Sequence, residues 1–337
     1  MNQTAKKPYN YCMDFLKGLA CIFVVFIHVK FPGDFGQAVQ AVARFAVPFF
    51  FMVSGYYYFR PDYQGVTGGG KKILHIFKIT FFAYLFYIVV ALLENQFLDG
   101  KNEFDFSVPQ IIHVAIYSVP SNVPNQLWFL IALLELYIIY FFVDLFRMKK
   151  LIYIMLIITF LAMIMLAQGA WYFGSHSLPN FYRNAWIEGF SFFTLGYYLH
   201  DQNDKIMIKN KTLVIFVIFS IVLSVVERFA CGRIFAVHLS TIPLVTCLFI
   251  YAIKNSENHA GTIQKIGKKY SMYVYILHMF FWKYLDRLIE YLSLQDNYLV
   301  SWLRPIMVLG FTILASMGCY VLFNCNNNKE LSKKVAI

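Results

Sequence analysis

The chain has 337 residues, of which 59% are hydrophobic, 19% aromatic and only 14% charged, and its mean hydropathy is +0.58. This composition excludes a soluble globular protein, which could not bury so much apolar surface, and predicts a polytopic membrane protein. The net charge of +11 comes from basic residues scattered among loops without a dense basic tract, which argues against a nucleic-acid partner.

Apolar segments recur along the whole chain, and most are long enough to cross a bilayer as a helix. We therefore expect an all-α bundle of about ten transmembrane helices. At about 34 residues per segment, little chain remains for a soluble part, so residues 1–337 are expected to form one membrane domain. The predicted spans are 12–31, 39–59, 73–93, 127–146, 150–168, 185–200, 211–227, 234–253, 270–289 and 300–323.

Lysines and arginines are unevenly distributed among the loops between these segments. With the N-terminus inside the cell, 18 of them fall in the tails and cytoplasmic loops and eight in the outer loops. The positive-inside rule then predicts that both termini are cytoplasmic. The first segment is too long for a cleaved signal peptide and contains a lysine, so we expect a retained helix.

The first segment holds two ionisable residues, Lys17 and His28, eleven positions apart. Eleven helical residues turn through about 1100°, so both lie on one helix face, about 16 Å apart along the axis. Ionisable groups inside a bilayer are costly and usually functional. For Lys17 the alternative is that its long side chain simply reaches the cytoplasmic surface.

Four of the ionisable residues in later predicted spans are candidates for a functional site: Arg44, Glu135, Glu188 and His278. The predicted topology places them, with His28, in the outer half or the middle of the bilayer. Each has a structural alternative, because a buried histidine can hydrogen-bond a neighbouring helix and the glutamates can simply neutralise Arg44.

His28 is the candidate general base, because a neutral imidazole suits that role near neutral pH. Asp14 cannot orient it, since fourteen helical residues separate the two by about 21 Å. A carboxylate partner must come from another helix, and Glu135 and Glu188 are the candidates. The six cysteines show neither a metal-binding nor a disulfide spacing, so no metal site is expected.

The region around Lys17 and His28 resembles the opening of the acyltransferase-3 family of membrane acyltransferases. Members begin with Asp-x-Leu-(Arg/Lys)-Gly/Ala-x-Ala and an apolar run that ends in histidine. The corresponding residues here are Asp14, Lys17 and His28, with lysine where many relatives have arginine.

Three later stretches are also similar to this family's motifs, and they follow in the family's order. Residues 48–56, which contain Ser54, resemble Phe-Phe-x-x-Ser-Gly-(Tyr/Phe). Residues 127–130, which contain Trp128, match Leu-Trp-Phe-Leu, and residues 271–278 resemble Ser-x-x-x-Tyr-x-x-His with His278 last. Together the four stretches extend over almost the whole chain.

The resemblance implies transfer of an acyl group, most often acetyl, from cytoplasmic acyl-CoA to a hydroxyl of a cell-envelope carbohydrate. The acceptor would be an envelope glycan or a lipid-linked sugar, and acetyl-CoA would be the co-substrate, without a metal. The protein would be a multi-pass protein of a bacterial cytoplasmic membrane, in contact with membrane lipid. The oligomeric state is left open.

On this basis we expect a catalytic set of His28, Arg44 and Glu135. Arg44 would stabilise the oxyanion or position the substrate, and Lys17 would meet the phosphate or pantetheine part of coenzyme A. We favour direct transfer, while Ser54 keeps a covalent acyl-enzyme open. The residues expected to bind substrate or donor are Lys17, Asp14, Ser54, Trp128, Glu188 and His278.

The main alternative is a proton-coupled transporter or flippase of an envelope precursor, which would use the same buried histidine, arginine and glutamate groups. Against it, the spans show no evident inverted repeat and no matched pair of broken helices.

Overall fold

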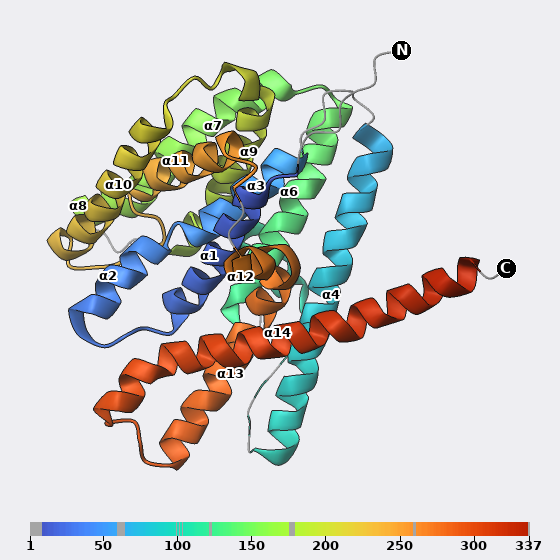
Figure 1. The fold of residues 1–337 in the computed structure, drawn as a ribbon, viewed down its shortest axis with the longest axis vertical. Helices are drawn as coiled ribbons and strands as arrows, with labels where there is room; N and C mark the ends of the chain where they lie inside the picture. The colour runs from blue at the N-terminus through green and yellow to red at the C-terminus, as the bar shows by residue number, and fades with distance from the viewer. Residues whose placement is uncertain are drawn as a thin grey trace. The chain divides into compact units, whose positions relative to one another are not determined.

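The computed structural model describes residues 9–58, 65–98, 100, 102, 104–120, 123–174, 179–258 and 261–335, with side chains except at 65–68 and 323–335. Every regular element within these ranges is helical, as the sequence predicts (Figure 1). The α-helices are α1 (Tyr11–His28), α2 (Gly33–Ala43), α3 (Ala46–Tyr58), α4 (Gly65–Phe97), α5 (Val108–Tyr117), α6 (Trp128–Leu145), α7 (Lys149–Ile164), α8 (Ala170–Tyr172), α9 (Phe190–Asp201), α10 (Asn210–Ala230), α11 (Thr241–Lys254), α12 (Gly261–Lys265), α13 (Ser271–Tyr291) and α14 (Tyr298–Val335). Short 3₁₀ turns occur at η1 (Asn125–Leu127), η3 (Pro179–Phe181) and η5 (Asn203–Lys205), and π turns at η2 (Met165–Gly169), η4 (Ala185–Gly189) and η6 (Ile266–Tyr270).

The chain forms two compact units that are discontinuous in sequence. The first unit comprises Met1–Ala46, Ile208–Ile234 and Ser240–Ile337. The second unit comprises Val47–Met207 and Phe235–Leu239. The N-terminal and C-terminal helices therefore belong to the same unit.

In the first unit, α1 packs against α2, α11, α12, η6, α13 and α14. Asn10 is the N-cap of α1, just before its first residue, and its side chain accepts a 2.7 Å hydrogen bond from the Met13 amide. Two glycines allow backbones to touch: a Cβ on Gly18 would lie 2.0 Å from the Ile263 carbonyl oxygen, and one on Gly267 would lie 1.9 Å from that of Asp14. The α1 helix is thus packed against α12 and η6 without intervening side chains.

In the second unit, α4 packs on α6 and α7 packs on α9. The α3 and α9 helices make a reciprocal glycine contact. A Cβ on Gly55 would lie 1.9 Å from the Phe193 carbonyl oxygen, and one on Gly196 would lie 2.0 Å from that of Met52. Gly55 belongs to the Ser-Gly-Tyr motif, so part of that motif has a packing role.

Seven stretches are long and apolar enough to cross a membrane: Tyr11–His28, Gly33–Tyr58, Gly69–Phe97, Asn125–Leu145, Lys149–Tyr172, Asn210–Ala230 and Tyr298–Leu322. Helices also cover most of the three remaining predicted spans, but α9 and α11 have only 12 and 14 residues. The third, α13, is 21 residues long, but its second half carries Lys283, Asp286, Arg287 and Glu290. The count of about ten membrane spans is therefore not confirmed, and the cytoplasmic placement of the termini remains a prediction.

Three boundaries differ from the sequence prediction. The predicted span 39–59 is two helices, because a turn at Arg44 and Phe45 separates α2 from α3; its last residue, Phe59, lies outside the described residues. The predicted span 234–253 becomes helical only at Thr241. The α5 helix was not predicted, although Pro109 near its start is a helix-initiating signal.

Candidate functional site

The nine candidate residues divide between the two units. The first unit contains Asp14, Lys17, His28, Arg44 and His278, and the second contains Ser54, Trp128, Glu135 and Glu188. Each group is described within its own unit.

His28 is the last residue of α1, and its imidazole lies against α13. The ring centroids of His28 and His278 are 5.2 Å apart with an interplanar angle of 40°. The Trp282 ring, one helical turn after His278, is 6.2 Å from the His28 ring. Two histidines that are 250 residues apart in sequence are therefore neighbours, a contact that the sequence analysis did not predict.

The environment of His278 fixes its tautomer. Its side chain is 0% exposed, and Nδ1 lies 2.8 Å from the Tyr275 carbonyl oxygen and 3.2 Å from that of Val274. A carbonyl oxygen can only accept a hydrogen bond, so Nδ1 carries the proton and donates it. In the neutral ring, Nε2 is then a lone-pair acceptor.

The Nε2 atom of His278 has no hydrogen-bond partner among the described residues. A buried polar atom without a partner costs about 1–3 kcal/mol. Such atoms are uncommon in folded proteins and call for a specific explanation. A buried acceptor without a partner thus belongs to the histidine whose ring neighbours that of His28.

The C-terminal end of α1 is also tied to α2. Gln40, which is buried on α2, donates a 2.6 Å hydrogen bond to the carbonyl oxygen of Ile27, the residue before His28. Four residues later, Arg44 follows the last residue of α2, and its backbone amide donates to the Ala41 carbonyl at 3.3 Å. Gln40 was missed in the sequence because a glutamine in an apolar segment does not by itself indicate a function.

Lys17 lies on the same helix as His28, as predicted, but it is paired with its own neighbour. Its Nζ donates to Asp14 at 2.8 Å, and the Tyr9 hydroxyl also donates to Asp14. Asp14 is buried, and the Lys17 side chain is 22% exposed. This i,i+3 ion pair neutralises the lysine locally.

In the second unit, Glu135 on α6 accepts a 2.7 Å hydrogen bond from the Ser118 hydroxyl. The same hydroxyl accepts one from the Ala185 amide at 3.1 Å, at the start of η4. Ser118 is fully buried and has a φ of 54°, a left-handed backbone conformation that is costly for a residue other than glycine. The sequence gives no signal for Ser118, because the fold alone brings it to Glu135.

Glu135 also lines a cavity of about 390 Å³ in the second unit. The cavity is bounded mainly by apolar and aromatic side chains, with Thr80, Tyr84, Asp105 and Gln110 as other polar lining residues. Glu135 thus combines a polar partner with access to a space of ligand size.

Glu188 lies in the π turn η4 and is 2% exposed. The turn is initiated by Asn184, whose side chain accepts 3.0 Å hydrogen bonds from the amides of Trp186 and Ile187. Because η4 packs against α6, the turn that holds Glu188 adjoins the helix that carries Glu135.

The other two candidates of the second unit have structural partners. The Ser54 hydroxyl donates to the Phe50 carbonyl at 2.9 Å. The guanidinium carbon of Arg183 lies 4.7 Å from the Trp128 ring centroid, a cation–π distance. Arg183 was counted only as an outer-loop charge in the sequence.

Comparison with known proteins gives one result. A family model described as an acyltransferase domain matches residues 10–323, nearly the whole chain and parts of both units. Searches of curated proteins and of solved structures returned no significant match.

Proposed function

Because the chain belongs to the acyltransferase-3 family, we propose that it moves an acetyl group from cytoplasmic acetyl-CoA to a hydroxyl of a cell-envelope carbohydrate. The family and the seven membrane-length helical stretches among the described residues support a multi-pass membrane acyltransferase. The donor, the acceptor and the bacterial cytoplasmic membrane belong to the proposal. It rests chiefly on one observation, the packing of His28 against the buried His278.

In the proposed reaction, His28 removes the proton of the acceptor hydroxyl as that oxygen attacks the thioester carbonyl. A tetrahedral oxyanion forms, and Arg44 is the proposed cation that stabilises it. When the carbon–sulfur bond breaks, the protonated His28 returns the proton to the coenzyme A thiolate. The products are the acetyl ester and coenzyme A.

We assign His278 a positioning role. A general base needs one nitrogen free, so the other nitrogen of His28 must carry a proton and find an acceptor. The Nε2 of His278 is a buried acceptor, and the centroid of its ring lies 5.2 Å from that of the His28 ring. This favours positioning over the direct substrate contact expected from the sequence.

The remaining roles stay proposals within the same scheme. Lys17, held by Asp14, is proposed to contact the phosphate or pantetheine part of the donor. Glu135 is proposed as a catalytic carboxylate whose position depends on Ser118. Glu188, Trp128 and Ser54 would contribute to substrate binding, and transfer would be direct, without an acyl-enzyme.

The test uses purified protein, labelled acetyl-CoA and an envelope glycan. His28→Ala is expected to lower the transfer rate by roughly 10²–10⁴-fold, the usual contribution of a general base. The matched control is His75→Ala, which removes an exposed histidine on α4 and should leave the rate unchanged.

Thermal unfolding of both variants should match that of the unsubstituted protein. Full transfer by a folded His28→Ala variant would refute His28 as the base. Solute flux across proteoliposomes without consumption of acetyl-CoA would instead identify a carrier.

A further inference from the structure

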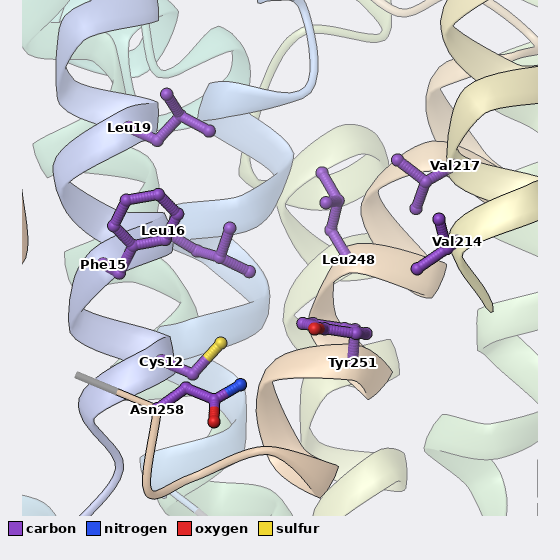
Figure 2. A pocket seen from close by; sticks show the side chains of 9 residues that line it. All are labelled: Cys12, Phe15, Leu16, Leu19, Val214, Val217, Leu248, Tyr251 and Asn258. Carbon is purple, nitrogen blue, oxygen red and sulfur yellow. The ribbon is translucent and has the colours of Figure 1, made fainter. Parts of the chain in front are cut away.

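An apolar groove runs along the first unit between α1, α10 and α11, and His28 is not among its lining residues (Figure 2). Its volume is about 360 Å³. This volume is near the lower end of the roughly 300–1,000 Å³ typical of ligand pockets. The groove can therefore hold a segment of a hydrocarbon chain.

The lining of the groove changes along its length. Leu16 and Leu19 of α1 face Val217 of α10 and Leu248 of α11 over most of it. Figure 2 shows the Asn258 side chain beside Cys12 at one end, and the Tyr251 hydroxyl next to that end. The groove is thus mainly apolar, with its polar atoms in the half that contains Asn258.

The groove opens on a helix whose outer face is exposed and apolar. Only 17% of the apolar window of α10 is buried, and Val214, which lines the groove, is 44% exposed. In a membrane this face is in contact with lipid chains. A lipid chain can therefore enter the groove from the side without crossing water.

Basic residues surround the polar end of the groove. Lys209 and Lys211 are exposed at the start of α10, within one or two turns of Val214. Lys254, at the end of α11, donates to the Ile208 carbonyl and brings the two helix ends together. Glu257, which precedes the lining residue Asn258, is an exposed acidic residue nearby, and the three lysines outnumber it.

We propose that the groove holds one acyl chain of an anionic membrane phospholipid, with the headgroup against Lys209 and Lys211. The apolar interior matches the chain, and the basic rim matches the negative charge of the headgroup. The electrostatic attraction of a lysine to anionic lipid is about 1 kcal/mol. This site is separate from the proposed transfer reaction and does not depend on it.

The experiment measures lipid binding to the detergent-purified full chain by native mass spectrometry. Phosphatidylglycerol and phosphatidylcholine with the same acyl chains are compared, and the former is expected to bind more tightly. Val214→Trp should fill the groove and weaken phosphatidylglycerol binding by roughly ten-fold or more. The control, Val222→Trp, places the same bulk at a 55% exposed position of α10 outside the groove and should have no effect.

A second pair of variants tests the headgroup without changing the packing. Lys211→Gln is expected to weaken phosphatidylglycerol binding roughly five-fold, which corresponds to about 1 kcal/mol. Lys30→Gln, at an exposed lysine beyond the other end of α1, should leave it unchanged. Thermal unfolding confirms that each variant is folded.

Equal binding of the two lipids, or unchanged phosphatidylglycerol binding in both Val214→Trp and Lys211→Gln, would overturn the proposal. Palmitoyl-CoA is the competing occupant. If the protein binds palmitoyl-CoA but not phosphatidylglycerol, and Val214→Trp abolishes the binding of palmitoyl-CoA, the groove binds a thioester donor and the proposal is wrong.

Discussion

Gly18 offers a direct test of how α1 is held in the first unit. In Gly18→Ala, the new Cβ would lie 2.0 Å from the Ile263 carbonyl oxygen and 2.9 Å from its carbonyl carbon. Cβ contacts below 3.0 Å essentially do not occur, so the two backbones must separate by about 1 Å. A gap of that size removes a quarter to a half of the dispersion energy of each contact that it opens.

We therefore expect Gly18→Ala to lower the free energy of unfolding by about 1–3 kcal/mol, the usual cost of overpacking. The matched control is Gly310→Ala on α14, where an added Cβ meets no atom within 4 Å. That variant should be as stable as the unsubstituted protein, or more stable by up to about 1 kcal/mol, because alanine favours a helix over glycine.

The assay is thermal unfolding in one detergent, followed by intrinsic tryptophan fluorescence. At roughly 2–4 °C per kcal/mol, Gly18→Ala should unfold about 2–12 °C lower. An unfolding temperature equal to that of Gly310→Ala would refute the direct backbone packing of α1 against α12.

Two other predictions concern His278 and Asp201. His278→Phe removes a hydrogen-bond acceptor whose loss is expected to raise the activation free energy by about 1.4 kcal/mol, so kcat should fall about ten-fold with little change in the KM of either substrate. His278→Gln keeps an acceptor and should recover part of the rate. A changed KM with unchanged kcat would contradict the positioning role. Partial burial raises the pKa of Asp201, but hydrogen bonds from Lys149 and Tyr153 outweigh it and hold that pKa below its usual value. The ionised carboxylate therefore stabilises the folded state above the unfolded-state pKa of Asp201, and this contribution is lost as the pH falls through the folded-state pKa. In Asp201→Asn, the free energy of unfolding should fall less steeply as the pH is lowered through the acidic range. An unchanged acidic pH dependence would refute the stabilising role of the Asp201 carboxylate.

Hydropathy predicted the helical fold well because long apolar runs leave little alternative to helices in a bilayer. Hydropathy did not predict the ends of two helices correctly. It predicted one span across the turn at Arg44 that separates α2 from α3, and it predicted that α11 begins at residue 234, although the helix begins at Thr241. Local hydropathy carries no information about where the chain turns.

The candidate site was predictable only in part. Motif resemblance pointed to His28 and His278, and the structure places their rings in contact distance. It could not point to Ser118 or Gln40, whose roles arise from segments distant in sequence. Small polar residues of this kind become informative only when the fold shows what they contact.

The division of the chain into interleaved units has a consequence for biosynthesis. Helix α1 is made long before α12, α13 and α14, against which it packs. At typical elongation rates, α1 waits on the order of tens of seconds for these partners. During that time Lys17 already has Asp14 three residues away, whereas His28 has to wait for His278. The costly charge of α1 is thus compensated locally from the start, and the histidine pair forms only after α13 has been made.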